Sequence, residues 1–282
     1  IVVILTGKQE IIESELSKFQ NYPKERIQVV NATEVIETAE PPVAAIRKKK
    51  DSSIVVGLNL VKKQEADAFV SSGSSGAILV GGQVIVGRSK GVQRPPLAPL
   101  IPTEKGVSLL IDCGANVDAR PDHLVQFAKM GSIYMEDVVG IKNPRVAIVN
   151  NGAEEEKGNA DVIVCEAFVG NVILKLYEGL GSTFMKMIKS GLMKDTRSKV
   201  GALLVKPAIK ETMKAFDASE YGGAPLLGLK GLVVKTHGSA KAVEIRHAIF
   251  QCVQFRQQKI NEKIAAHMVE ETQKAETPKE EA

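Results

Sequence analysis

The 282-residue sequence contains no tryptophan, and only four tyrosines and eight phenylalanines supply aromatic rings. This scarcity argues against a surface that stacks sugars or bases. The net charge of +4 is too small to predict a dedicated nucleic-acid-binding protein. No apolar run reaches about 18 residues, the length expected of a membrane-spanning helix. We therefore expect a cytoplasmic protein that does not bind nucleic acid.

Three cysteines, Cys113, Cys165 and Cys252, lie far apart and form no C-x-x-C pair. A zinc site or a redox pair is therefore not expected. The odd number indicates a reducing compartment. Neither a metal nor a cofactor is predicted.

Apolar runs rich in Val, Ile and Leu alternate with helical patterns along the chain. Strands are expected at 1–5, 27–30, 68–70, 107–111, 145–149, 162–165 and 231–234. Helices are expected at 9–19, 43–50, 51–63, 77–88, 121–130 and, as one long helix, 240–270, with a proline-rich connector at 95–102. Such strands are typical of a parallel sheet covered on both faces, so we expect a three-layer α/β/α sandwich with a mostly parallel sheet.

This pattern predicts a single domain over residues 1–272, followed by a disordered charged tail at 273–282. Two segments of the sequence are shorter than the expected architecture requires. The sequence opens inside an apolar strand, and only about ten residues separate the strands near 149 and 161, where a parallel crossover needs a dozen or more. We expect further residues before Ile1 and near Gly158 in the natural protein.

One loop has the composition of an anion site. An apolar strand ends in Ser71-Ser72-Gly73-Ser74-Ser75-Gly76, and a helical pattern follows at once. Glycine permits tight turns and close approach, and a helix N-terminus favours negative charge. The loop is neither a Walker A motif nor a G-x-G-x-x-G fingerprint. The alternative is a plain strand-to-helix connection.

Other predicted strands also end in loops rich in glycine and asparagine, at 112–121, 150–158 and 166–171. Ligands of parallel sheets bind at the carboxyl ends of the strands. We therefore expect these loops to meet at one sheet edge, together with 221–224 and 237–239. Each loop alone is equally typical of an ordinary turn, and Asp112 and Asp118 are equally suited to capping. His237 is a better catalytic candidate than His123, which is expected on a helix, while His247 and His267 are expected to be surface or packing residues.

Together these motifs resemble one family, the bacterial phosphate acyltransferases of phospholipid synthesis. The resemblance covers essentially the whole chain and rests on Ser71–Ala77, Val86–Pro99, Asp112–Pro121, Tyr221–Ala224 and His237–Ser239. It implies a relative of phosphotransacetylase within the isocitrate-dehydrogenase-like fold group, a homodimer, and no cofactor. The implied reaction transfers a long-chain acyl group from acyl carrier protein to inorganic phosphate, giving acyl phosphate.

The resemblance implies the following roles for the candidate residues. Phosphate binding is assigned to Ser71, Ser72, Gly73, Ser74, Ser75, Gly76, Arg94 and Lys157. Candidate catalytic residues are Asn116, Asn151, Asn171 and His237, with the asparagines as oxyanion donors. The remaining loop residues are Asp112, Gly114, Gly222, Gly223, Gly238 and Ser239. The family's opening Asp-Ala-Met-Gly-Gly-Asp is absent, its Ser-Ala-Gly-Asn-Thr-Gly loop is the serine-rich loop here, and its Asp-Gly-Phe is Glu166-Ala-Phe168.

A basic helical arm is expected at about 175–216, where nine basic residues face three acidic ones. Leu176, Leu180, Phe184 and Met187 fall on one helical face. Gly191 and Gly201 are expected to break a helix that ends before Pro207. Three interpretations stay open: dimer packing, a surface for an acidic carrier protein, and peripheral contact with an anionic membrane.

Three other functions remain possible from the sequence. The first is a phosphotransacetylase acting on a short acyl-CoA. The second is a metal- and NAD-dependent decarboxylating dehydrogenase, which is disfavoured because no cluster of aspartates is visible. The third is a non-enzymatic scaffold for lipid synthesis.

Overall fold

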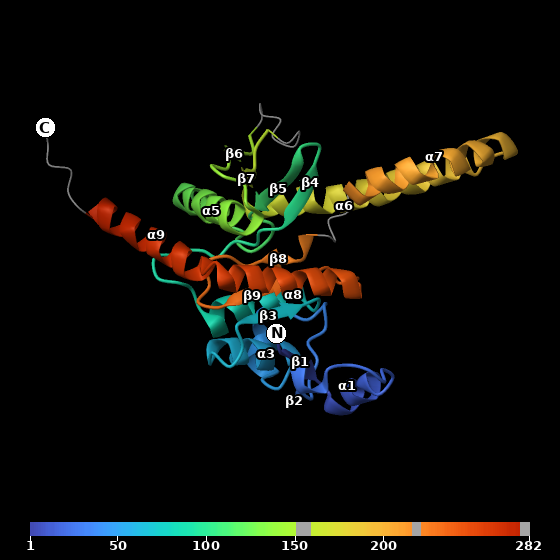
Figure 1. The fold of residues 1–282 in the computed structure, drawn as a ribbon. Helices are drawn as coiled ribbons and strands as arrows, with labels where there is room; N and C mark the ends of the chain where they lie inside the picture. The colour runs from blue at the N-terminus through green and yellow to red at the C-terminus, as the bar shows by residue number, and fades with distance from the viewer. Residues whose placement is uncertain (151–158, 216–220, 277–282) are drawn as a thin grey trace, which may run out of the picture. The chain divides into compact units, whose positions relative to one another are not determined.

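The computed structural model describes residues 1–150, 159–215 and 221–276. The chain divides into two compact units, drawn in Figure 1. The first unit contains Ile1–Pro95 and Tyr221–Ala282, and the second contains Pro96–Glu220. The single domain expected over 1–272 stays a prediction, and the end of the predicted tail lies outside the described residues.

The first unit holds two sheets. In one, β1 (Val3–Gly7) pairs in parallel with β2 (Ile27–Asn31). In the other the strand order is β3–β9–β8, with β3 (Ala68–Ser71) parallel to β9 (Leu232–Lys235). The short strand β8 (Ala224–Pro225) runs antiparallel to β9. The helices of this unit are α1 (Gln9–Leu16), η1 (Lys24–Arg26), α2 (Pro42–Lys48), α3 (Ser53–Lys62), α4 (Ser75–Gly81), the π-helical turn η2 (Gly82–Val86), α8 (Ala242–Gln257) and α9 (Ile260–Glu276).

Helices cover both faces of the β3–β9–β8 sheet, with α8 on one side and α3 on the other (Figure 1). Helix α3 is apolar along its core face, and the hydroxyl of Ser52, which precedes it, accepts the N–H of Val55 and caps the helix. The strand β9 is buried from Leu232 to Val234 because it lies between two neighbours and beneath helices.

The second unit is built on one four-stranded sheet in the order β4–β5–β7–β6. Its strands are β4 (Leu100–Thr103), β5 (Gly106–Ile111), β6 (Val146–Ile148) and β7 (Val162–Val164), and its helices are α5 (Pro121–Tyr134), the π-helical turn η3 (Met135–Val139), α6 (Ala167–Leu192) and α7 (Thr196–Ala215). The β5–β7 and β6–β7 pairs are parallel, and β4 runs antiparallel to β5. Across the chain most strand pairs are parallel, which confirms the predicted α/β class.

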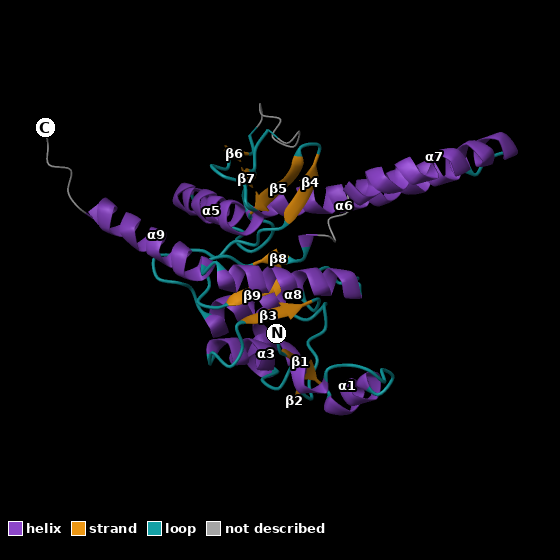
Figure 2. Cartoon of the chain, in the orientation of Figure 1, coloured by secondary structure: helices purple, strands orange, loops and turns teal. Residues whose placement is uncertain are grey.

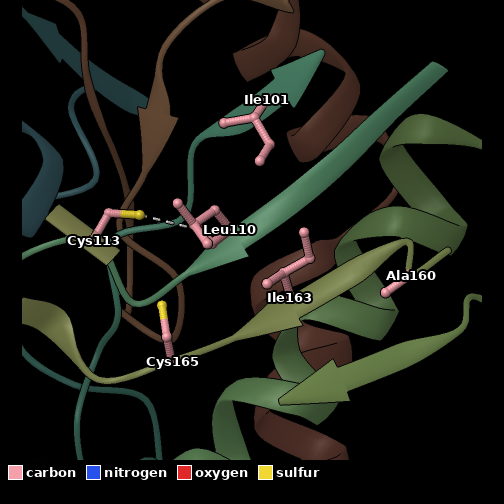
Figure 3. Packing of buried hydrophobic residues seen from close by; sticks show 6 residues of the cluster. All are labelled: Ile101, Leu110, Cys113, Ala160, Ile163 and Cys165. Atoms are coloured by element: carbon pink, nitrogen blue, oxygen red, sulfur yellow. Dashed lines mark hydrogen bonds between the residues drawn. The ribbon is translucent and has the colours of Figure 1, made fainter. Parts of the chain in front are cut away.

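Alternate residues of β5 and β7 face opposite helices. Leu109 and Val162 face α5, where a Cβ on Gly131 would lie 2.7 Å from Val162 and 3.3 Å from Leu109. On the other face, Leu110 and Ile163 join a cluster with Ile101, Cys113, Ala160 and Cys165 (Figure 3). Apolar residues of α6 pack against this cluster. Burial on both faces explains why these strands read as unbroken apolar runs.

Two boundary predictions are wrong. The expected long C-terminal helix is two helices, because α8 ends at Gln257 and Lys259 adopts a left-handed φ of 53° before α9 begins. The expected proline-rich connector contains the strand β4, in which Pro102 is opposite Val107. Proline is tolerated there because β4 is an edge strand and its N–H side need not pair.

The predicted arm is the helix pair α6–α7, whose members contact each other and form the longest helices in Figure 2. The expected break at Gly191 is confirmed, because α6 ends at Leu192. The break at Gly201 and the end before Pro207 are wrong, because both residues lie inside α7. No described helix of the chain is long and apolar enough to cross a membrane.

Candidate active site

Three of the sequence motifs meet at one edge of the β3–β9–β8 sheet. Ser71 ends β3 in register with Lys235, which ends β9. The N–H of Thr236 then donates to the Ser71 carbonyl over 3.0 Å. Because β8 is antiparallel and begins opposite Lys235, residues 221–223 reach the same edge. The serine-rich loop, the Tyr-Gly-Gly turn and the His-Gly-Ser turn are therefore neighbours.

The serines of the loop divide into two pairs. Ser71 Oγ accepts the N–H of Gly73 over 3.1 Å, and Ser74 Oγ accepts the N–H of Ala77 over 3.4 Å as the N-cap of α4. Ser71 thus stabilises the turn and Ser74 caps the helix, as expected if this part of the loop is an ordinary strand-to-helix connection. Ser72 and Ser75 are exposed, and they are the hydroxyls of this loop best placed to meet a ligand.

The glycines of this loop serve packing rather than left-handed backbone. Neither Gly73 nor Gly76 has a positive φ. A Cβ on Gly76 would lie 2.5 Å from the ring of Pro42, so glycine lets α4 approach the start of α2. The sequence predicted that the glycines of this loop let the backbone approach a ligand closely. At Gly76 the structure instead shows a close approach to Pro42 of the same protein.

His237 has a defined orientation at the end of β9. Its Nδ1 accepts the backbone N–H of Ser239 over 3.2 Å and lies 2.7 Å from Ser239 Oγ. Because the N–H donates to Nδ1, the neutral ring carries its proton on Nε2. The side chains of His237 and Ser239 are exposed, and Gly238 lies in open space between them. An exposed ring of fixed tautomer suits a role in proton transfer or hydrogen bonding.

Gly222 and Gly223 complete this edge. Gly222 has a φ of 86°, and the N–H of Gly223 donates to Gln251 Oε1 over 3.1 Å. Gln251 comes from α8, so this helix fixes the turn that precedes β8. A side chain at Gly223 would collide with Val234, since its Cβ would lie 2.5 Å from that residue.

Sequence reasoning missed Lys235 and Thr236. Lys235 places a cation at the end of β9 beside the serine-rich loop, and its Nζ donates to the Thr236 carbonyl. Thr236 is 2% exposed. Both residues come immediately before His237 in the sequence. They could have been found by considering the last residues of the predicted strand as well as the loop that follows it.

The second unit gathers its own set of loops. Strands β5, β6 and β7 are parallel, so Asp112, Asn150 and Glu166 all follow carboxyl ends at one edge of that sheet. The prediction that all the strand-exit loops share one sheet edge is wrong, because β3 and β9 belong to a different sheet from β5 and β7. The candidate residues therefore form two sets, one in each unit.

Asp112 is the centre of the second set. It is fully buried, and its carboxylate accepts the N–H groups of Leu97, Ala115 and Asn116 and the side-chain amide of Asn116 at 2.8–3.1 Å. Burial raises the pKa of Asp112, while these hydrogen bonds oppose the increase. All four partners are donors, which suits the ionised carboxylate. Asp112 therefore stabilises the turn that follows β5. This is the capping role that the sequence analysis gave as the alternative to a role in the site.

Asn116 and Asn171 differ in their surroundings. Asn116 is 3% exposed and donates to Asp112, whereas Asn171 is exposed near the start of α6. Atoms of Asn171 would lie 3.9 Å from a Cβ on Gly114, whose φ is 116°. The Gly114 turn and Asn171 are thus adjacent, and an exposed amide there is the better placed oxyanion donor.

The other predicted residues are placed as follows. Asn151 and Lys157 lie outside the described residues. Arg94 is half-buried in the first unit, in the segment of sequence that follows η2. His123 is buried in the first turn of α5, where its Nδ1 accepts the Arg120 N–H over 3.0 Å, so it is a capping residue.

The three cysteines are buried and poorly suited to nucleophilic chemistry. Burial raises the pKa of Cys165 and of Cys252 to about 12 and raises that of Cys113 further. Thiols in such surroundings stay protonated at neutral pH and are inert. Within residues 1–150, 159–215 and 221–276, no group of three His, Cys, Asp or Glu side chains is arranged to hold a metal.

A cavity of about 480 Å³ lies at the opposite ends of β3 and β9. Asp67 and Leu232, which adjoin or begin these strands, are among its lining residues, and none of the predicted site residues lines it. Ligands of such sheets bind at the carboxyl ends of strands. We therefore place the candidate site at the edge formed by Ser71 and Lys235.

Comparison with solved structures defines the class of fold. A phosphotransacetylase from Streptococcus pyogenes superposes with a TM-score of 0.57 at 17% identity, covering 89% of this chain and 85% of its own. The EutD phosphotransacetylase from Staphylococcus aureus gives 0.55 at 16% identity, covering 90% and 86%. The chain therefore has the phosphotransacetylase fold.

Sequence comparison defines the family. The chain belongs to the family described as fatty acid synthesis protein, whose model matches residues 1–161 and 156–263. The two matches overlap at residues 156–161, within the connection between β6 and β7. A phosphate acyltransferase of Alkaliphilus oremlandii is 48% identical, covering 94% of this chain and 88% of its own length. One of Clostridium novyi is 43% identical, covering 95% and 90%.

Proposed function

We propose that this protein transfers a fatty acyl group from a thioester to inorganic phosphate and so supplies acyl phosphate for phospholipid synthesis. The observation that carries the proposal is the 43–48% identity, over nearly the whole chain, to phosphate acyltransferases. The resemblance read from the motifs supports the same reaction.

The reaction needs positioning more than strong base catalysis. A phosphate oxygen attacks the thioester carbonyl, the new C–O bond forms, and the tetrahedral oxyanion collapses as the C–S bond breaks. The electron pair leaves on sulfur as a thiolate. Phosphate is already anionic at neutral pH, so the enzyme must orient it and stabilise the oxyanion. Neither task needs a nucleophilic cysteine.

The candidate residues divide between these tasks. Ser72 and Ser75 offer exposed hydroxyls to phosphate, and Lys235 adds positive charge at the same edge. Arg94 and Lys157 stay candidates for phosphate binding, as Asn151 and Asn171 do for the oxyanion. One well-placed oxyanion donor is worth about 3 kcal/mol in the transition state.

The acyl donor is proposed to be acyl carrier protein, with the basic arm α6–α7 as a surface that an acidic carrier can bind. Its apolar stripe is exposed, with Leu176 and Leu180 near 57% and Phe184 at 65%. A stripe of this kind marks an interaction surface. It also supports the homodimer and the peripheral membrane contact proposed for the arm.

The deciding experiment measures acyl phosphate formed by the purified protein from palmitoyl carrier protein, palmitoyl-CoA and acetyl-CoA, with and without phosphate. We expect phosphate-dependent product from the long-chain carrier substrate. Product from acetyl-CoA alone would establish a phosphotransacetylase instead. Thioester that persists in every reaction would favour a scaffold, and turnover that ignores phosphate would rule the proposal out.

A further inference from the structure

Thr236 carries a hydroxyl that the described protein does not satisfy. The residue is 2% exposed, and its Oγ1 is buried with no hydrogen-bond partner among residues 1–150, 159–215 and 221–276. An unpaired buried hydroxyl costs about 1–3 kcal/mol. Valine has the same shape without this cost, so the hydroxyl at this position calls for an explanation.

The position of Thr236 is fixed from several directions. Its N–H donates to the Ser71 carbonyl, and its own carbonyl accepts Lys235 Nζ. Its methyl group faces the turn before β8, where a Cβ on Gly223 would lie 3.1 Å from Cγ2. A β-branched side chain is stiff about χ1, so these contacts also restrict the hydroxyl.

The residue also occupies the middle of the candidate edge. Strand β9 lies between β3 and β8, and Thr236 directly follows it. The serine-rich loop lies on one side and residues 221–223 on the other. A restrained, unsatisfied donor at this point is oriented before any ligand binds.

We propose that the Thr236 hydroxyl donates a hydrogen bond to the phosphate substrate. This inference rests on the proposed function and adds a phosphate-binding residue to it. Because the hydroxyl has no partner among the described residues, the bond to an anion breaks no hydrogen bond that the structure describes.

The test compares Thr236→Val with Thr236→Ser. We expect T236V to raise the KM for phosphate about 10- to 100-fold, the effect of one hydrogen bond to a charged group. The KM for the acyl donor should not change. T236S, which keeps the hydroxyl, should recover most of the phosphate affinity. The melting temperature of T236V should equal or exceed that of the wild type, because the change removes no hydrogen bond to a described residue.

Thr6→Val is the matched control. Thr6 Oγ1 donates to the Ser53 carbonyl over 3.1 Å, so the same change removes a hydrogen bond that exists. T6V should lower the melting temperature by about 2–4 °C and leave the KM for phosphate unchanged. A wild-type KM in T236V, or a loss of stability in T236V equal to that of T6V, would overturn the inference.

Calorimetric titration of inorganic phosphate separates this inference from the proposed function. If the wild type makes no acyl phosphate, the proposed function fails, yet phosphate affinities still compare T236V with wild type. Weaker phosphate binding in T236V alone supports the role of the hydroxyl. Equal binding in the two proteins, or none in either, refutes it.

Discussion

Asn116 holds Asp112 twice, because its backbone N–H and its side-chain amide both donate to Asp112 Oδ2, over 2.9 and 2.8 Å. The N–H groups of Leu97 and Ala115 donate to Oδ1. One buried carboxylate therefore joins the loop after β5 to the segment before β4. This arrangement fixes the Gly114 turn against which Asn171 lies.

Asp112→Asn should destabilise the protein by about 2–3 kcal/mol, because one acceptor becomes an NH₂ group that faces N–H donors. Equilibrium denaturation measures this loss. Glu104→Gln is the control, since this exposed carboxyl lies in the same unit and should change stability by less than about 0.5 kcal/mol. Equal stability of the two variants would contradict the anchoring role of Asp112.

The sequence was sufficient to predict β5 and β7 because these strands are buried on both faces. The runs at Leu109–Ile111 and Val162–Val164 need no alternation, and they pair as neighbours in the structure. The Ser52 cap was also predictable, since the preference of serine for N-caps is local chemistry. Features that depend only on residues close in sequence can therefore be predicted without knowledge of the tertiary structure.

Strand order and partners depend on distant segments and could not be predicted. Nothing near Ser71 in the sequence indicates that its strand pairs with one ending at Lys235. Gly201 and Pro207 read as breaks, yet α7 continues through both. Whether a serine caps or remains exposed depends on where the helix begins, which is why the serine-rich loop divides into two pairs only in the structure.

The acid stability of the second unit should depend on Asp161. Arg145 donates to it from its backbone N–H, Nε and Nη2 at 2.7–3.0 Å, and these bonds lower the pKa of Asp161. A lowered folded pKa gives stability that is present above the unfolded value, near 3.8, and is lost as pH falls through the folded pKa.

Asp161→Asn should therefore lower the melting temperature at pH 7 by about 2–4 °C. The difference from wild type should shrink as the pH falls below about 4, because the wild-type carboxyl then becomes protonated. Scanning calorimetry from pH 7 to pH 3 measures both effects. A difference that does not vary with pH would show that the ion pair does not account for it.

Gly170→Ala tests the contact between α6 and the Asp112 loop. A Cβ there would lie 2.0 Å from the Asp112 carbonyl oxygen, a backbone atom that cannot rotate away. We expect a loss of at least about 3 kcal/mol in the free energy of unfolding. Gly181→Ala in the same helix meets nothing within 4 Å and should gain up to about 1 kcal/mol. Similar effects at both positions would disprove the contact.

Ser75→Ala and Ser74→Ala should separate phosphate binding from capping. S75A removes an exposed hydroxyl and should raise the KM for phosphate about tenfold with little change in stability. S74A removes the N-cap of α4 and should cost about 1 kcal/mol of stability. Steady-state kinetics and thermal melts measure the two effects. Unchanged phosphate kinetics in S75A would remove Ser75 from the site.

The exposed stripe of α6 should govern binding to anionic vesicles. Leu180→Glu with Phe184→Glu places two carboxylates where 58% and 65% exposed apolar side chains lie. Burying each side chain contributes about 1.5–3 kcal/mol, so vesicle affinity should fall at least about a hundredfold. Ile11→Glu, at 59% exposure on α1, is the control and should sediment with vesicles as the wild type does. If the double variant instead becomes monomeric in size-exclusion chromatography while still binding vesicles, the stripe serves the dimer rather than the membrane.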